Sequence, residues 1–236
     1  MPAPLIIGHR GLPLEYPDNS LPGIVAAGSI CGMVEVDVRR SVDGVLMLSH
    51  DPVLGDMVVA ETPWELLRRV DLGGGLSPPD LESVLEACPV PLNLEIKHHP
   101  WEPGFDNTYG FPIDVAGRAR PNDLITSFHL GTVAAVLAAE PEVRTGFIVP
   151  EQGVLGAAIE DAVSEGHAVV GAHWSLLVDN TEAKVLEAHE SGVELIAWTV
   201  DDPDLGSLLA AAGVSGIVSN DPIGLIAHLG EAAGRG

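Results

Sequence analysis

The sequence predicts an α/β fold, a single (β/α)8 TIM barrel domain over residues 1–236 with a short insertion after the second strand. Three observations predict this fold class. Apolar, β-branched runs recur at fairly even spacing through the 236 residues. Each run is followed by a turn signal and then by an amphipathic segment, an alternation typical of parallel strands joined by helices. Eight such runs favour closure into a barrel over an open doubly wound sheet, and barrels of this length form one domain.

This rhythm assigns each expected element to a residue range. The strands are expected at residues 5–8, 33–38, 91–97, 123–128, 144–149, 168–172, 194–200 and 215–219. Helices between them are expected at residues 20–29, 81–87, 130–139, 153–165, 181–191 and 203–212. Residues 51–79, with one helix near 64–70, and the aperiodic residues 98–113 break the rhythm. Because both segments follow strands, we expect them to lie over the face of the barrel that carries active sites.

The second expected strand carries two carboxylates on one face. Residues 33–38 read Met-Val-Glu-Val-Asp-Val. Side chains two apart on a strand point the same way, so Glu35 and Asp37 share one face and the valines share the other. Asp43-Gly44 then predicts a tight turn, after which the chain returns through residues 45–48 to His50. The segment therefore brings two carboxylates and an imidazole to one mouth of the barrel.

Glu95, in the third expected strand, completes a candidate metal site. Three carboxylates that converge from neighbouring strands form an all-oxygen site, which suits Mg²⁺ or Ca²⁺ and not Zn²⁺. Glu35, Asp37 and Glu95 each have valine, leucine or isoleucine on both sides, unlike solvated surface acids. Carboxylates buried in this way need a cation between them. We therefore expect one divalent cation, Mg²⁺ or Ca²⁺, as a cofactor.

Two histidines flank this predicted metal site. His9 follows the first strand, and His50 lies at the end of the run that returns from the second strand. Hydrolysis needs a base and an acid with pKa values near neutrality, so this pair is the catalytic candidate, with either histidine as the acid. Weaker candidates for lining the mouth are His98, His99, His129 and His173, whereas His167, His189 and His228 are expected to be structural.

Arg10 and Lys97 are the cations nearest the proposed centre. An arginine can hold a phosphoryl oxygen through two hydrogen bonds, and a lysine can act there as a point charge. Lys97 has an alternative role as an ion-pair partner of Glu95, and the two roles are compatible. Trp198, at the end of the seventh expected strand, is a candidate either for core packing or for the wall of a small substrate pocket.

The composition excludes some classes of partner. With 34 acidic and 11 basic residues the formal net charge is −23 at pH 7, a surface that repels nucleic acid and anionic membranes. No run approaches the length of a membrane span, and residues 1–4 lack the pattern of a secretion signal, so we expect a cytoplasmic protein without stable membrane association. Cys31 and Cys88 lie in apolar surroundings and are expected to be buried free thiols, with a disulfide between them as the minor alternative. The composition does not determine the oligomeric state.

Short motifs follow one another from the first expected strand to the last: His9-Arg10-Gly11, Pro17-Asp18-Asn19-Ser20, Glu35-Val36-Asp37-Val38, Asp43-Gly44, His50-Asp51, Leu94-Glu95-Ile96-Lys97, Ser127-Phe128, Trp198-Thr199, Gly213-Val214 and Asn220-Asp221-Pro222. In this order they resemble the glycerophosphodiester phosphodiesterase family. The resemblance implies a (β/α)8 barrel that hydrolyses small glycerophosphodiesters to glycerol 3-phosphate and an alcohol. It gives the candidate histidines, carboxylates and cations the roles stated above, and it puts Trp198 on the glycerol side of the substrate.

The sequence departs from that family's usual pattern in its loops. Asp18-Asn19-Ser20 stands where the family usually has Glu-Asn-Thr, so a contact from the shorter Asp18 to the metal or a histidine would need a bridging water. Residues 53–56 replace an Arg- or Thr-rich turn, and residues 101–109 match no familiar pattern. Two alternatives therefore stay open. One is a barrel that binds a phosphodiester without turnover, and the other is a lysophospholipase D-like hydrolase with an apolar entrance built from Trp64, Trp101, Phe105 and Phe111.

Overall fold

The computed structural model describes residues 3–233, and its parallel strands close into the predicted eight-stranded barrel. Closure occurs at β1 (Leu5–Gly8), which pairs with β2 (Met33–Arg40) on one side and with β11 (Gly216–Ser219) on the other. From β2 the order continues through β6 (Leu92–Ile96), β7 (Leu124–Ser127), β8 (Arg144–Val149), β9 (Val169–His173) and β10 (Glu194–Trp198) to β11. The fold class predicted from the sequence is confirmed.

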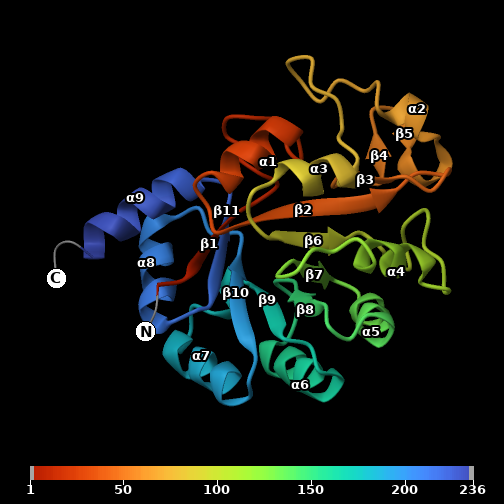
Figure 1. Ribbon diagram of the computed structural model, residues 1–236. Coiled ribbons are helices and arrows are strands. Elements are labelled where there is room, and N and C mark those ends of the chain that lie inside the picture. Colours follow the sequence, from red (N-terminus) through yellow and green to blue (C-terminus); the bar gives the residue numbers. More distant parts are fainter. Residues whose placement is uncertain (1–2, 234–236) are drawn as a thin grey trace.

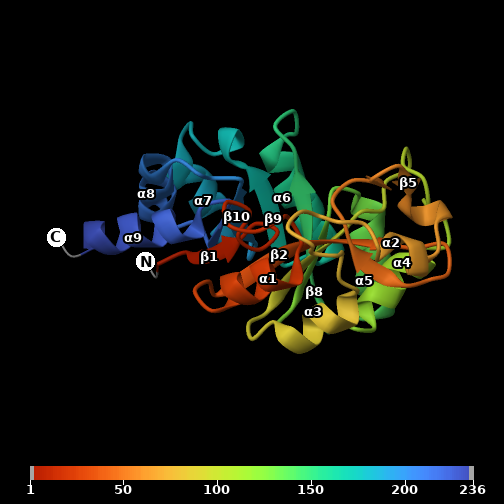
Figure 2. The same cartoon turned by 90° about the horizontal axis from the view of Figure 1, so that it is seen from above.

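Helices follow the barrel strands and lie around the outside of the sheet in both views (Figures 1 and 2). Their bounds are α1 (Leu21–Gly28), α3 (Leu81–Ala87), α4 (Gly110–Ala116), α5 (Leu130–Ala139), α6 (Leu155–Glu165), α7 (Thr181–Glu190), α8 (Pro203–Ala212) and α9 (Pro222–Ala233). Several begin at capping residues that the sequence makes easy to recognise. Asp80 and Asp202, for example, accept main-chain N–H groups in the first turns of α3 and α8.

Alternation along the strands separates the barrel interior from the side that the helices cover. On β10, Leu195 and Ala197 pack into the apolar layer shared with α7 and α8. Ile196, between them, belongs instead to a small interior cluster that includes Ile7 and Val169. Side chains nearer the carboxyl ends of the strands therefore stand above an apolar floor.

The chain leaves the barrel after β2 in a hairpin. β3 (Leu46–Leu48) runs antiparallel to β2, and Gly44 occupies the turn between them with a φ of +89°. This is the tight turn that Asp43-Gly44 predicts, because only glycine adopts such a φ readily. The hairpin and the residues that follow it lie at the opposite end of the molecule from α8 and α9 (Figures 1 and 2).

Short elements in the two irregular segments were harder to predict. The insertion contains β4 (Val53–Leu54), β5 (Met57–Val58) and η1 (Val59–Glu61), none of them expected, and its helix α2 covers only Trp64–Leu67. The segment expected to be aperiodic through residue 113 ends in α4, which buries Phe111 and Val115. Elements of two to seven residues carry too few positions for a periodic pattern.

Cys31 and Cys88 are buried free thiols, as predicted. Burial raises the pKa of Cys31 to about 11, so this thiol stays protonated at neutral pH and is a packing residue. Among the helices of residues 3–233, none combines the length and the apolar character needed to cross a bilayer.

Candidate active site

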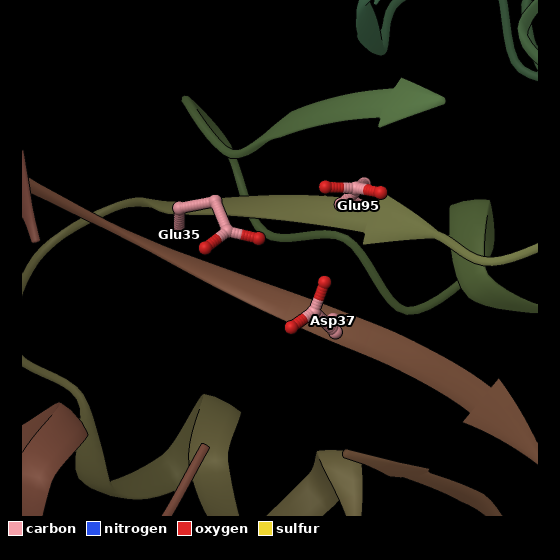
Figure 3. A group of neighbouring side chains, drawn as sticks. All are labelled: Glu35, Asp37 and Glu95. Atoms are coloured by element: carbon pink, nitrogen blue, oxygen red, sulfur yellow. The ribbon is translucent and has the colours of Figure 1, made fainter. Parts of the chain in front are cut away.

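Three carboxylates meet near the carboxyl ends of β2 and β6. Glu35 and Asp37 lie two apart on β2, and the register of the two parallel strands sets Asp37 beside Glu95 of β6. All three side chains are buried, and one oxygen from each lies within 4.8 Å of the others. Figure 3 shows the three carboxylates turned toward one another from their two strands. The alternation that the sequence predicts thus brings the three acidic residues together.

Two cations neutralise part of the charge of this cluster. Lys97 Nζ lies 2.8 Å from Asp37 Oδ1 and also contacts the carboxylate of Glu95. Arg10 Nε lies 3.1 Å from Asp37 Oδ2, and the main-chain N–H of Arg10 donates to Glu35 Oε2 at 3.0 Å. Burial alone would raise the pKa of Asp37, but Lys97 and Arg10 outweigh it and hold that pKa at about 2. Asp37 is therefore a carboxylate at any working pH.

Glu35 and Glu95 are less fully compensated. Burial raises the pKa of both, and the negative charge of Asp37 raises it further. Glu35 Oε1 is buried and has no hydrogen-bond partner among the described residues. A buried carboxylate oxygen without a donor is costly unless a cation approaches it. The donor set is all oxygen and is arranged around one point, so the residues present fit a hard dication such as Mg²⁺ or Ca²⁺.

The segment between β1 and α1 contributes a side chain that the sequence analysis did not single out. Asn19, in a left-handed conformation with a φ of 58°, donates from Nδ2 to Asp37 Oδ2 at 2.8 Å. Its Oδ1 accepts the Asp37 main-chain N–H at 3.0 Å. Asp18 pairs directly with Arg10 Nη1 at 2.9 Å. The short Asp18 side chain thus reaches the Arg10 guanidinium directly, and the need for a bridging water in any contact from Asp18 to a metal or a histidine stays a prediction.

His9 is held through its own ring. Nδ1 lies 2.6 Å from Asn220 Oδ1, and Asn220 Nδ2 donates to Asp201 Oδ2 at 2.8 Å. Because the amide nitrogen is committed to Asp201, the amide oxygen must face His9, and Nδ1 must carry the proton. Nε2 of neutral His9 then has its lone pair free, 3.9 Å from Glu35 Oε2. Burial lowers the pKa of His9, with the charge of Arg10 acting in the same direction.

His50 reaches the same cavity from the hairpin side. Its Nδ1 lies 2.7 Å from Asp51 Oδ1, and this pair is open to solvent, with 43% of the His50 side chain and 73% of the Asp51 side chain exposed. The preceding residue is tied to the metal-site strand, since the Ser49 N–H donates to Asp37 O at 3.0 Å. His50 and His9 line one cavity together.

That cavity has a volume of about 150 Å³ and joins the polar cluster to an apolar wall. Glu35, Glu95, Arg10 and Lys97 line its polar side. Phe128 and Trp198 form part of the apolar side and pack edge to face, with ring centroids 5.3 Å apart. Trp198 Nε1 donates to Gly171 O at 3.0 Å, which fixes the indole plane at the cavity wall.

The remaining histidines do not line this cavity. His98 bonds Thr132 and is packed among aromatic rings, while His99 stacks on Trp101 at a centroid distance of 5.1 Å. His129 bonds Thr132, His173 bonds Ser175, and His167, as expected, is a buried structural residue bonded to Thr145.

The apolar entrance required by the lipid alternative is not assembled. Phe111 is buried in the core, and Trp64 and Phe105 are half-buried. Trp101 alone of the four aromatic side chains is largely exposed, at 76%. A lone exposed ring is too small a patch to hold an acyl chain.

Known proteins resemble this chain over most of its length. Residues 9–223 match the Glycerophosphoryl diester phosphodiesterase family. Glycerophosphodiester phosphodiesterase GDPD4 of Arabidopsis thaliana is 26% identical over 239 residues, which cover 93% of this chain and 71% of the relative. A glycerophosphodiester phosphodiesterase structure from Parabacteroides distasonis superposes with a TM-score of 0.84 at 21% identity and covers 98% of both chains. An Oleispira antarctica phosphodiesterase, solved in complex with the product sn-glycerol-3-phosphate, gives a TM-score of 0.80 at 25% identity, covering 96% of this chain and 97% of that one.

Proposed function

The chain belongs to the glycerophosphoryl diester phosphodiesterase family and is a hydrolase of glycerophosphodiesters. We propose that it releases glycerol 3-phosphate and an alcohol by a metal-dependent route that uses two histidines. The observation that supports the proposal best is the meeting of two imidazoles, two cations and three buried carboxylates around one small cavity. A phosphodiester monoanion needs local positive charge in a protein whose overall charge is strongly negative.

Glu35, Asp37 and Glu95 would hold one dication, Mg²⁺ or Ca²⁺. The dication is included because the three candidate ligands offer only oxygen atoms and because Glu35 Oε1 has no hydrogen-bond partner among the described residues. When bound, such an ion polarises a phosphoryl oxygen. Arg10 and Lys97 lie against the same carboxylates, so they are within reach of the phosphoryl group and offset the charge that develops on it.

The two histidines move the protons. His9 Nε2, which carries the free lone pair, accepts the proton of the attacking hydroxyl as its oxygen bonds to phosphorus. The bond from phosphorus to the leaving oxygen breaks, and protonated His50 gives that oxygen its proton. The attacking hydroxyl belongs either to water or to the 2-position of the glycerol, and in the second case water then opens a cyclic phosphate. Phe128 and Trp198 form the wall against which the glycerol carbons lie.

The test is the release of glycerol 3-phosphate from glycerophosphocholine before and after complete chelation with EDTA. We expect turnover to stop on chelation and to return with Mg²⁺ or Ca²⁺. The variant Glu35→Gln should lose roughly 100-fold or more in turnover and should bind the cation more weakly by calorimetry. Glu82→Gln is the matched control, because Glu82 is a surface acid of α3 that pairs with Arg118, just after α4.

Three outcomes would contradict the proposal. Turnover that survives complete chelation would show that the reaction does not need a metal. Cation binding without turnover of any diester would favour the non-catalytic barrel. Faster release of choline from lysophosphatidylcholine than from glycerophosphocholine would favour the lipid hydrolase.

A further inference from the structure

One arginine beyond the proposed site contacts its second histidine. Arg39 is the next residue on the face of β2 that carries Glu35 and Asp37, and it is only 5% exposed. Its Nε and Nη2 both donate to the main-chain oxygen of His50, at 3.0 and 2.7 Å. Its Nη1 and Nη2 donate to Glu102, at 2.9 and 3.3 Å. One guanidinium thus joins β2, the hairpin and the loop after β6.

These contacts matter because His50 has few others. Among residues 3–233 its ring has one hydrogen-bond partner, Asp51, an exposed residue whose hydrogen bond is weakened by solvent. The ring position therefore depends on where the main chain places its Cα. A guanidinium is planar and rigid, so a two-donor contact to one carbonyl oxygen fixes that oxygen in direction as well as in distance. Glu102 supplies the negative charge that makes a buried guanidinium tolerable.

Resting on the proposed catalytic role of His50, we propose that Arg39 is a positioning residue, which holds the His50 imidazole at the cavity by clamping its carbonyl oxygen to β2. It acts through His50: Arg39 does not line the cavity that His9 and His50 share, and four of its N–H groups already donate hydrogen bonds. Removal of Arg39 leaves the His50 carbonyl and the Glu102 carboxylate without their donor. The imidazole then samples positions away from the leaving oxygen. Proton transfer is therefore impaired more than substrate binding.

Arg40 provides a matched control. It has the same charge, is one residue further along β2 on the opposite face, and also pairs with the loop after β6, through Asp106 at 3.3 Å. Its guanidinium stacks over Phe111 and makes no contact with His50. A general loss of positive charge or of loop attachment would affect the Arg39→Gln and Arg40→Gln variants alike. A loss of His50 positioning affects only Arg39→Gln.

The experiment is a double-mutant cycle on hydrolysis of glycerophosphocholine, with kcat and KM measured for each variant. Arg39→Gln should lower kcat roughly 10- to 100-fold and change KM less than about threefold. Arg40→Gln should change kcat less than about threefold. In a His50→Ala background, Arg39→Gln should cost less than about twofold, because the ring that Arg39 positions is already gone.

The cycle separates this inference from the function on which it rests. If His50→Ala loses most of its activity but Arg39→Gln lowers the residual rate of that background by its full factor, the positioning role is wrong and the histidine pair stands. If His50→Ala turns over at the wild-type rate, both the positioning role of Arg39 and the catalytic role of His50 are wrong. An Arg40→Gln loss equal to that of Arg39→Gln also overturns the positioning role.

A folding defect in Arg39→Gln is checked by thermal unfolding. Should that variant not fold, Arg39→Lys and Glu102→Gln replace it in the same cycle. Arg39→Lys keeps the charge but lacks the fork, so it should recover folding and only part of kcat. Recovery of full kcat by lysine, or a change confined to KM, would overturn the proposal.

Discussion

The two histidines at the cavity are supported in opposite ways. His9 is held by its ring, through Asn220 and then Asp201, which lie just after the last strand and in the loop before α8. His50 is held by its main chain, through Arg39 and then Glu102, and within the described part of the chain its ring has one hydrogen-bond partner, an exposed carboxylate. The first support fixes a tautomer and a ring plane. The second fixes a Cα position and leaves the ring free to turn.

This difference matches the two proposed tasks. A base that takes a proton from one small hydroxyl gains from a fixed lone-pair direction, which the His9 support provides. An acid that protonates leaving alcohols of different sizes gains more from a ring that can adjust its position than from a fixed ring plane. The main-chain support of His50 allows this adjustment. The two regions therefore should respond differently when substrate, support or pH is changed.

The largest expected effect comes from removing either ring and changing the leaving group. His9→Ala and His50→Ala should each lose roughly 100-fold or more in kcat with glycerophosphocholine. With a glycerophosphodiester of p-nitrophenol, whose leaving oxygen needs no proton, His50→Ala should recover most of its loss and His9→Ala should not. Initial rates of p-nitrophenolate release give the measurement. The reverse pattern of rescue would exchange the acid and the base.

The next effect tests the ring support of His9. Asn220→Ala removes the acceptor of the His9 Nδ1 proton and lets the imidazole ring rotate. We therefore expect kcat to fall roughly 10- to 100-fold with little change in KM. Asp201→Asn weakens the same support one step further away and should cost less. Steady-state kinetics of both variants provide the check, and a KM effect without a kcat effect would place Asn220 in substrate binding instead.

A smaller effect is expected from the corresponding change beside His50. Asp51→Ala removes the one hydrogen bond that the ring makes to a described side chain, but the pair is exposed and screened, so kcat should fall only about two- to fivefold. The loss should shrink further in high salt, where the Asn220→Ala loss should not. If Asp51→Ala costs as much as Asn220→Ala, the contrast between the two supports is wrong.

The sequence made the strands and the carboxylates predictable for one physical reason. Alternation along a buried strand determines which face each residue occupies, so the pairing of Glu35 with Asp37 follows from the sequence alone. The eight strand ranges follow from the same local pattern. Short helices such as α4 escape prediction because a single turn or two cannot display a period.

The supports of the histidines were not predictable, and their geometry shows why. His9 and Asn220 lie 211 residues apart and meet only because the barrel closes. Closure predicts that the first and last strands are neighbours, but not that an amide oxygen faces Nδ1. Arg39 and Glu102 are likewise joined across 63 residues, through a loop without any recognisable pattern. Long-range polar contacts depend on loop conformations that local patterns do not encode.

The smallest expected effect is a difference in acid sensitivity between the regions. The loop that carries Glu102 also holds His98, whose Nε2 accepts the Asp106 N–H at 3.2 Å while its Nδ1 bonds Thr132. Burial lowers the pKa of His98 to about 4; the charge of Asp106 opposes the shift, and His129 and Arg40 add to it. The unfolded chain takes up this proton near pH 6.5, so it binds more protons than the folded chain between about pH 6.5 and about pH 4. Stability therefore falls as the pH is lowered through that window.

His98→Gln isolates this contribution, because glutamine can still accept from one side and donate to the other without titrating. Between about pH 7 and about pH 4.5 the variant's thermal midpoint should fall by a few degrees less than that of the wild type. Hydrogen exchange should show residues 98–109 losing protection in acid before residues 201–220, since the His50 support depends on this loop and the His9 support does not. Equal slopes of midpoint against pH in the two proteins would show that His98 is not the titrating group. Simultaneous loss of protection in the two segments would mean that the supports open as one unit.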